Sequence, residues 1–131
     1  MTRPVRPLLI EAAGQLRVAG VESPEQDARQ LLAYAAGVEL ARLPLLDGVD
    51  DAAAAYFQTL IDKRLHRIPL QHLTGRAHFR HLELEVGPGV FVPRPETEVM
   101  TGWAIEQLRP MVYAVARRES RRLPVVVELG T

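Results

Sequence analysis

Apolar residues in the first half of the chain recur every three to four positions, which is the period of an α-helix that buries one face. The first such segment covers residues 5–19, and Gly20 follows it as a C-terminal stop. Its stripe consists of Leu8, Leu9, Ala12, Ala13, Leu16 and Ala19. The pattern therefore predicts a helix over 5–19.

A second helix is predicted from Ser23 to Gly37. Ser23 occupies the N-cap position, Pro24 lies in the first turn, and Gln26 follows the serine by three residues. In this arrangement the serine and glutamine side chains cap the helix start reciprocally. Gly37 supplies the end of the helix.

Two further helices complete an expected N-terminal bundle. Residues 38–48 predict a short helix ended by Pro44 or Gly48. Residues 50–67 begin with acids and end with bases, as the helix dipole favours. This long fourth helix has an apolar stripe that needs a partner surface, so residues 1–75 predict an all-helical domain.

The period changes to two after residue 75. Alternating apolar residues are followed by the turn sequence Gly87-Pro88-Gly89 and then by Val90-Phe91-Val92. A β-hairpin with a long loop is therefore predicted at 76–93.

Helical spacing returns at Pro95 and continues past Pro110, where the missing N–H predicts a kink or break near residue 109. The segment "VVVEL" at 125–129 has the continuous β-branched pattern of a strand buried on both faces of a parallel sheet. The sequence holds no neighbouring strand for it. We therefore expect the chain to be the front part of a longer protein.

Composition narrows the class of protein. The 131 residues are 47% hydrophobic and 24% charged, which is typical of a globular protein. Cysteine is absent and no apolar stretch approaches the length of a membrane helix, so a cytoplasmic location and no membrane partner are expected. Sixteen basic residues balance sixteen acidic ones, which argues against direct nucleic-acid binding.

The histidines do not predict a metal site. His78 and His81 are three apart in an expected strand region and so face opposite ways; with His66 and His72 they are interpreted as surface or hydrogen-bonding residues. The arginines at 117–122 are interpreted as a solvated, dipole-matched helix end.

The corner "VPRPETE" is the most unusual feature. Arg94 lies between Pro93 and Pro95, which bars it from helical dihedral angles and holds it extended. Glu96 and Glu98 lie in the first turn of the following helix, where the dipole stabilises carboxylates. Two interpretations stand: a well-capped helix start with a surface ion pair, or a rigid strand-to-helix corner that forms one wall of a small-molecule pocket.

Three segments, "RIPLQHLTGRAHF", "GPGVFVPRPETE" and "VVELGT", together resemble the peptide-chain release factor glutamine methyltransferases in order and spacing. The resemblance covers residues 67–131 closely. It implies an α+β chain: a helical substrate-recognition domain at 1–75, a β-hairpin linker at 76–93, and at 94–131 the first helix and strand of a truncated Rossmann-like methyltransferase domain.

The resemblance implies S-adenosyl-L-methionine as cofactor and release factors as partners. Glu128 would shape the cofactor loop from the end of its strand, and Gly130 and Thr131 would begin that loop.

The same resemblance implies roles for the corner. Phe91 matches an aromatic position that lines the pocket for the substrate glutamine, and Arg94, Glu96 and Thr97 match a corner near the cofactor. The Asn-Pro-Pro-Tyr motif that supplies the family's hydrogen-bond acceptors is absent from this sequence. No catalytic residue is therefore assigned here, and the chain by itself is expected to be inactive.

Two alternatives remain open. The chain could be a non-catalytic module that binds release factors, or part of a methyltransferase directed at adenine in DNA or RNA. The balanced charge argues mildly against the nucleic-acid substrate.

Overall fold

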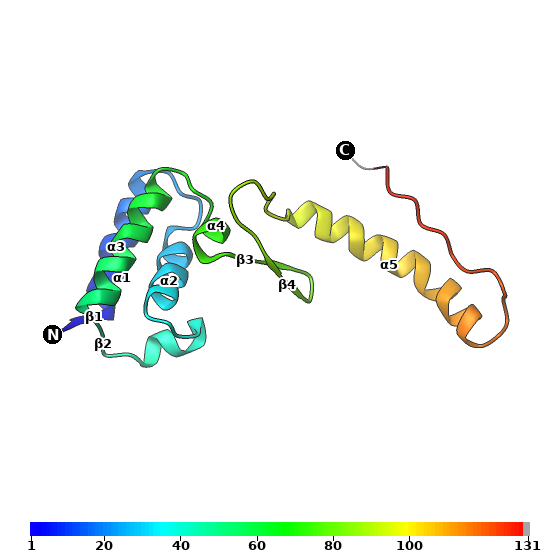
Figure 1. Ribbon diagram of the computed structural model, residues 1–131, viewed down its shortest axis with the longest axis horizontal. Helices are drawn as coiled ribbons and strands as arrows, with labels where there is room; N and C mark the ends of the chain where they lie inside the picture. Colours follow the sequence, from blue (N-terminus) through cyan, green and yellow to red (C-terminus); the bar gives the residue numbers. More distant parts are fainter. Residues whose placement is uncertain (130–131) are drawn as a thin grey trace. The chain divides into compact units, whose positions relative to one another are not determined.

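The computed structural model describes residues 1–129 and mixes helices with two small antiparallel sheets (Figure 1), which confirms the predicted α+β class. Two compact units are present: Met1–Ala77 with Glu83–Val92, and His78–Leu82 with the chain from Pro93 onward. The elements run in the order β1 (Thr2–Pro4), α1 (Val5–Val18), α2 (Pro24–Ala35), the 3-10 helix η1 (Leu40–Leu45), β2 (Gly48–Asp50), α3 (Asp51–Leu65), α4 (Leu70–Thr74), β3 (Arg76–Phe79), β4 (Leu82–Glu85) and α5 (Pro95–Ala116).

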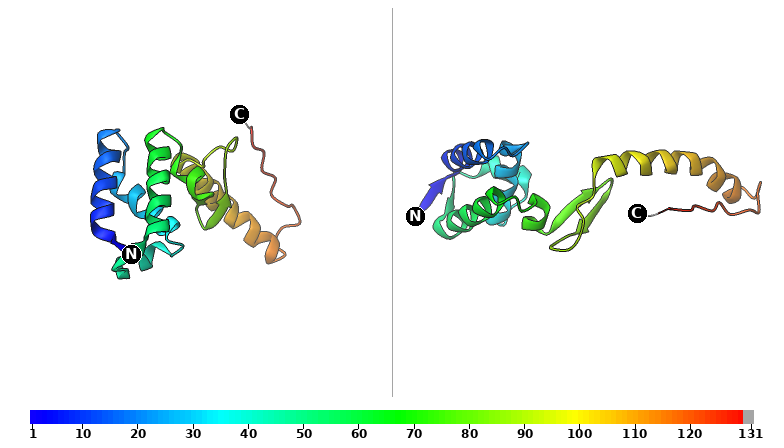
Figure 2. Two further views of the ribbon diagram at one scale, coloured as in Figure 1. Left: turned by 60° about the vertical axis from the view of Figure 1, so that its left-hand side comes forward. Right: turned by 90° about the horizontal axis from the view of Figure 1, so that it is seen from above.

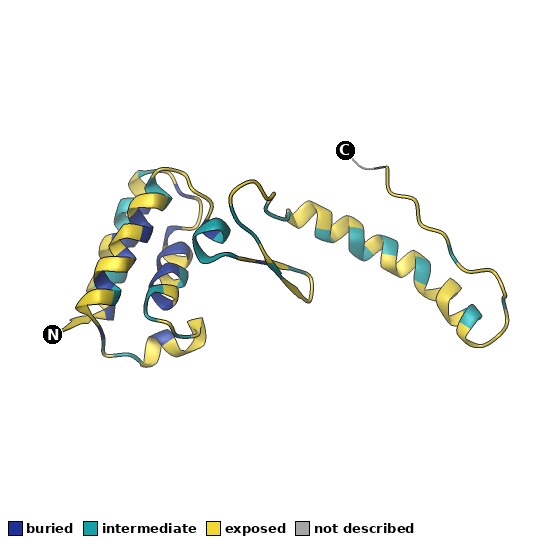
Figure 3. Cartoon of the chain, viewed as in Figure 1, coloured by how far each residue is buried: buried dark blue, intermediate teal, exposed yellow. Residues whose placement is uncertain are grey.

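The first unit contains a helical bundle built from α1, α2 and α3, which pack on one another (Figure 2). Figure 3 shows that the buried residues gather on the inner faces of these helices. The largest fully buried side chains are Leu16, Leu31, Leu32, Leu43, Phe57, Leu60 and Ile61. The apolar stripes of the three long helices cover one another and form a bundle. Residues 1–75 are not all-helical as predicted, because they also contain β1 and β2.

The capping of these helices differs from the expectation. Within the described residues the Ser23 side chain makes no cap hydrogen bond; its backbone has φ −127° and ψ 66°, outside the usual N-cap geometry. The predicted reciprocal cap is therefore wrong. Helix α3 has the side-chain cap instead, because the Asp50 carboxylate accepts a hydrogen bond of 2.7 Å from the Ala53 N–H.

A two-stranded sheet joins the N-terminus to the segment before α3, and the sequence pattern did not predict it. Strands β1 and β2 pair antiparallel, with Arg3 opposite Val49 and Pro4 opposite Gly48. A Cβ atom on Gly48 would lie 2.9 Å from the carbonyl oxygen of Arg3, so only glycine allows this close approach. Three-residue strands have too few positions to show an alternating pattern.

The hairpin lies where it was predicted, but its turn does not. Strands β3 and β4 pair across a turn at Arg80 and His81, with Arg80 at φ 54°. Pro88 and Gly89 form a separate turn after β4, closed by the Val90 N–H donating to the Gly87 carbonyl at 2.9 Å. The expected long-loop hairpin through Gly87-Pro88-Gly89 is therefore wrong: residues 90–92 form no strand. The two-residue turn gives a register that the alternation of Leu82 and Leu84 alone does not fix.

Helix α5 runs without interruption through Pro110, so no break occurs near residue 109, and the kink that the sequence allowed as the alternative stays a prediction. A proline removes one backbone hydrogen bond, and an exposed helix tolerates that loss when the carbonyl left without a partner can meet water. None of the described residues of α5 is buried. Its exposed large apolar side chains are Val99, Met100, Trp103, Ile105, Met111, Val112 and Tyr113.

The predicted strand at 125–129 is not formed. Residues 120–129 have no regular secondary structure, and Val125 and Leu129 are 84% and 90% exposed. A strand needs a hydrogen-bonded neighbour, and within the described residues this segment has none. No helix among the described residues is long and apolar enough to cross a membrane.

Candidate functional site

The backbone conformation defines the corner between the hairpin and α5. Arg94 is the N-cap residue of α5, with extended dihedral angles of φ −102° and ψ 146°, and Pro95 occupies the first turn. The Arg94 carbonyl accepts hydrogen bonds from the N–H groups of Thr97 at 3.1 Å and Glu98 at 3.3 Å. The two prolines hold Arg94 extended, as predicted, and the helix begins directly after it.

Three predicted site residues share this helix start. Arg94, Glu96 and Thr97 are exposed, and their side chains emerge within one turn. The Thr97 carbonyl accepts a 2.7 Å hydrogen bond from the Thr101 hydroxyl, which is a contact internal to the helix. The corner therefore presents a guanidinium, a carboxylate and a hydroxyl to its surroundings.

Phe91 lies in the extended segment before the corner and belongs to the first unit. Its side chain is 98% exposed. The residue before it is fixed, because the His72 Nε2 donates to the Val90 carbonyl at 2.9 Å. An aromatic ring that is fully exposed beside an anchored residue is a surface available for contact.

The remaining predicted cofactor residues are at the end of the chain. Glu128 is exposed and lies in a segment without regular secondary structure. Among the described residues no hydrogen bond or ion pair joins Glu128 to the corner. Gly130 and Thr131, the predicted start of the cofactor loop, lie outside the described residues.

The contact between Arg80 and Glu98 beside the corner was not predicted from the sequence. The Glu98 carboxylate accepts a 3.0 Å hydrogen bond from the Arg80 N–H, and the Arg80 guanidinium lies 3.4 Å from the Glu98 carbonyl. A groove beside this contact is lined by Arg80, His81, Glu98, Val99, Gly102, Trp103 and Glu106. Nothing in the local pattern pairs residues 18 positions apart.

The histidines behave as interpreted from the sequence. His66 Nδ1 donates to the Asp62 carbonyl at 2.7 Å, His72 bonds to Val90, and His78 and His81 are exposed. Residues 1–129 contain no group of three or more carboxylate, histidine or cysteine side chains placed to hold a metal ion.

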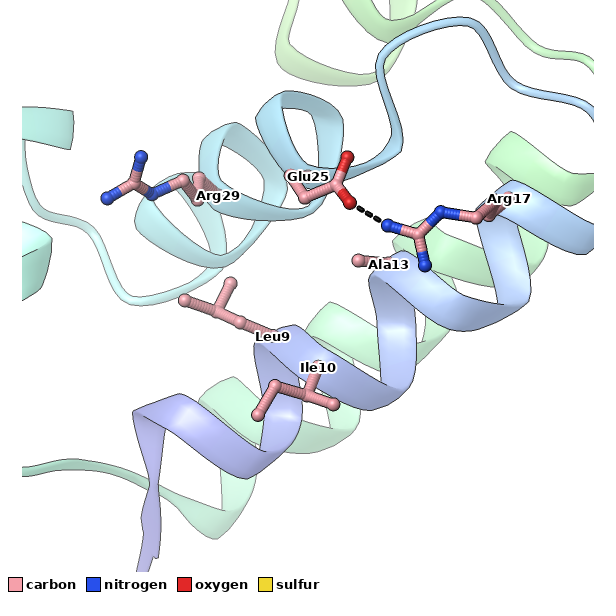
Figure 4. A pocket seen from close by; sticks show the side chains of 6 residues that line it. All are labelled: Leu9, Ile10, Ala13, Arg17, Glu25 and Arg29. Atoms are coloured by element: carbon pink, nitrogen blue, oxygen red, sulfur yellow. Dashed lines mark ion pairs between the residues drawn. The ribbon is translucent and has the colours of Figure 1, made fainter.

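The first unit also has an apolar groove between α1 and α2, with a volume of about 330 Å³. Its floor is formed by Leu9, Ile10 and Ala13 (Figure 4). Arg17 pairs with Glu25 across one end, and Arg29 lies at the other. This groove is separate from the corner and belongs to the helical bundle alone.

The described residues thus combine a helical bundle, a short hairpin and a helix that begins between two prolines. Residues 7–75 match the family model described as the PrmC N-terminal domain, and the chain belongs to this family. The family resemblance inferred from the three sequence segments is thereby confirmed.

Several relatives carry the name release factor glutamine methyltransferase. That of Streptomyces coelicolor is 52% identical over 101 residues, which are 77% of this chain and 35% of the relative. That of Mycolicibacterium smegmatis is 49% identical over 110 residues, 84% of this chain and 39% of the relative. That of Deinococcus radiodurans is 41% identical over 108 residues, 80% of this chain and 38% of the relative. The chain thus spans just over a third of the length of these relatives.

Proposed function

We propose that this chain supplies the recognition domain and part of the active-site wall of a protein that methylates the glutamine side chain in the Gly-Gly-Gln motif of peptide chain release factors. The observation that carries the proposal is the 49% identity over 110 residues to the Mycolicibacterium smegmatis release factor glutamine methyltransferase. Any stretch of 110 residues in a chain of 131 includes residues 22–110, and so includes the corner.

The burial pattern supports the proposed split between a recognition domain and the start of a catalytic domain. Every residue of the buried apolar cluster belongs to the first unit, whereas none of the described residues of α5 is buried. A unit with its own core suits a recognition domain at 1–75, joined by the linker at 76–93. The exposed apolar residues of α5 and of 123–129 suit the first helix and strand of a Rossmann-like domain that further chain would complete.

The donor set of the corner fits S-adenosyl-L-methionine in part. A guanidinium at Arg94 suits the cofactor's carboxylate, and the carboxylates of Glu96 and Glu128 can accept hydrogen bonds from ribose hydroxyls. The Thr97 hydroxyl can donate or accept. These side chains are exposed, so they would supply only one wall of the pocket, and the rest of the pocket requires other residues. When bound, the cofactor supplies an electrophilic methyl group on a sulfonium.

The proposed chemistry assigns Phe91 to the substrate. A carboxamide nitrogen is a weak nucleophile because its lone pair is delocalised into the carbonyl. Its reaction therefore depends on orientation and on exclusion of water. A ring that is 98% exposed can lie flat against the amide plane of an incoming glutamine.

A longer polypeptide that continues past residue 131, incubated with labelled S-adenosyl-L-methionine and a release factor, tests the proposal. We expect label in the release factor, and none when the glutamine of its Gly-Gly-Gln motif is replaced by alanine. Label in DNA or RNA instead would favour the adenine-directed alternative and overturn the proposal.

The non-catalytic module is the second candidate, and the self-contained core of the first unit favours it. Capture of a release factor by residues 1–75 supports recognition under either proposal. The 131-residue chain alone is expected to transfer no methyl group. Transfer by that chain would rule out the module.

A further inference from the structure

The hairpin turn and the first turn of α5 are joined within the second unit. The Arg80 N–H donates to the Glu98 carboxylate at 3.0 Å. In the reverse sense, the Arg80 guanidinium Nη1 lies 3.4 Å from the Glu98 carbonyl. One residue thus contacts both the side chain and the backbone of the other, and we name this pair of contacts the Arg80–Glu98 clasp.

The backbone conformation of Arg80 places its N–H for this contact. Its φ of 54° is in the left-handed region, which is uncommon for a residue with a side chain. That conformation belongs to the two-residue turn between β3 and β4. The N–H that donates to Glu98 is therefore that of the turn residue itself.

Gly102 makes room for the clasp. A Cβ atom on Gly102 would lie 2.6 Å from the Arg80 Nη1, closer than carbon and nitrogen atoms approach without a bond. Glycine inside a helix lowers helix stability by about 1 kcal/mol relative to alanine, so its presence in α5 has a local cost. The guanidinium that covers the missing side chain gives that glycine a role.

The clasp closes a loop of chain that contains the corner. Arg80 and Glu98 are 18 positions apart, and Phe91 and Arg94 lie between them. Val90, also in this loop, accepts a hydrogen bond of 2.9 Å on its carbonyl from His72, which lies before the loop. The segment from Phe91 to Thr97 is therefore flanked along the chain by a contact of the first unit at Val90 and a contact of the second unit at Glu98.

We infer that Arg80, Glu98 and Gly102 are positioning residues, which hold the segment carrying Phe91 and Arg94 in one path by closing the Arg80–Glu98 clasp. The functional meaning of that path rests on the proposed function, since it would set Phe91 for the substrate amide. The clasp itself is a property of this chain and is tested without any methyl transfer.

Two measurements on the 131-residue chain test the inference. Amide hydrogen exchange at Arg80 reports the bond to Glu98, and the rate at which chymotrypsin cuts after Phe91 reports how freely the segment moves. In Glu98→Ala we expect both rates to rise about fivefold, as for a lost hydrogen bond to a charged group at the surface. Glu98→Gln keeps an acceptor oxygen and should restore much of the protection.

Glu96→Ala is the matched control, because it removes a carboxylate from the same first turn that has no contact with the hairpin among the described residues. Both rates should stay at their wild-type values. Equal acceleration by Glu96→Ala and Glu98→Ala would mean that the helix start alone matters, and would overturn the inference.

Gly102→Ala separates the clasp from helix stability. The added methyl group strengthens α5 but displaces the guanidinium, so cleavage after Phe91 should become faster although the helix is more stable. Slower cleavage in Gly102→Ala would contradict the inference. So would faster Arg80 exchange in Glu98→Ala without faster cleavage. Failure of methyl transfer in the longer polypeptide would leave these results unchanged.

Discussion

The Nε of Arg64 donates to the Oδ2 of Asp27 at 2.8 Å, and this ion pair joins the end of α3 to the first turn of α2. The side chains are only 18% and 10% exposed. A second guanidinium nitrogen of Arg64 donates to the Ile68 carbonyl at 3.3 Å, so the cation has further support. The pair joins two residues of the bundle that are 37 positions apart in the sequence.

Removing the Asp27 carboxylate should lower the free energy of unfolding of the bundle strongly. In Asp27→Ala the nearly buried guanidinium of Arg64 loses its partner, and breaking such a pair costs about 3 kcal/mol. Urea unfolding followed by circular dichroism measures the loss. Arg17→Ala is the control, since the Arg17–Glu25 pair is exposed and should change stability by less than about 1 kcal/mol. Equal losses would show that burial of the Asp27 pair is unimportant.

Helix capping gives a second prediction. Asp50→Ala removes the acceptor of the Ala53 N–H and should lower the free energy of unfolding by about 1 kcal/mol. Ser23→Ala should change it by less than about 0.5 kcal/mol, since the Ser23 side chain makes no cap hydrogen bond in the described residues. Thermal unfolding of both variants decides between them. A larger effect at Ser23 would restore the cap predicted from the sequence.

The phenol of Tyr56 should ionise at a higher pH than an ordinary tyrosine. Partial burial, then the charge and the hydrogen bond of neighbouring Tyr34, raise the pKa of the Tyr56 phenol above its ordinary value; the two ring centroids are 6.3 Å apart. Ultraviolet titration should show one tyrosine ionising above the ordinary range. Tyr34→Phe should lower the pKa of Tyr56, because only the partial burial remains.

The same shift predicts the direction of a pH effect on stability. A folded-state pKa that is raised favours the protonated phenol in the folded protein, so the stabilisation is present below the ordinary pKa of 10.0 and is lost as pH rises through the folded pKa. Wild-type protein should therefore lose more stability than Tyr56→Phe over that alkaline window. Parallel losses in both proteins would show that Tyr56 is not responsible.

The substitution Phe91→Ala should leave the stability of the fold unchanged and lower methyl transfer. The side chain is 98% exposed, so thermal unfolding should be unchanged within about 0.5 kcal/mol. In the longer polypeptide, methyl transfer to the release factor should fall tenfold or more, by about the cost of losing orientation of the amide. Phe91→Tyr keeps the ring and should retain activity, and Leu82→Ala, an exposed apolar residue outside the corner, should have no effect. Full activity in Phe91→Ala would remove Phe91 from the proposed site.

Elements with many residues were predictable from local pattern. The stripe from Leu8 to Ala19 gave α1 within one residue at its end, and the proline-flanked Arg94 gave the extended N-cap of α5. Each depends on interactions within a few positions along the chain. The β1–β2 pair was not predictable, because its hydrogen bonds join segments far apart in the chain. The turn at Arg80 and His81 is local, but it lacks the Asn-Gly or Asp-Gly sequence that is typical of two-residue hairpin turns.

The candidate site, too, was only partly predictable from local sequence. Sequence located the corner and its exposed side chains, whereas the contact of Arg80 with Glu98 and the space left by Gly102 came only from the structure. The predicted strand at 125–129 has the right composition but no partner among the described residues, and composition alone does not supply a hydrogen-bonded neighbour.

The sequence by itself determined the helical stripes, the rigid corner and the family, because dihedral restriction by proline and apolar periodicity act over one or two turns. Only the tertiary structure decided which charges meet, such as Asp27 with Arg64, and which residue holds the hairpin turn to α5. Those contacts depend on burial and on distances between segments far apart in the chain, and both arise only once the core has formed.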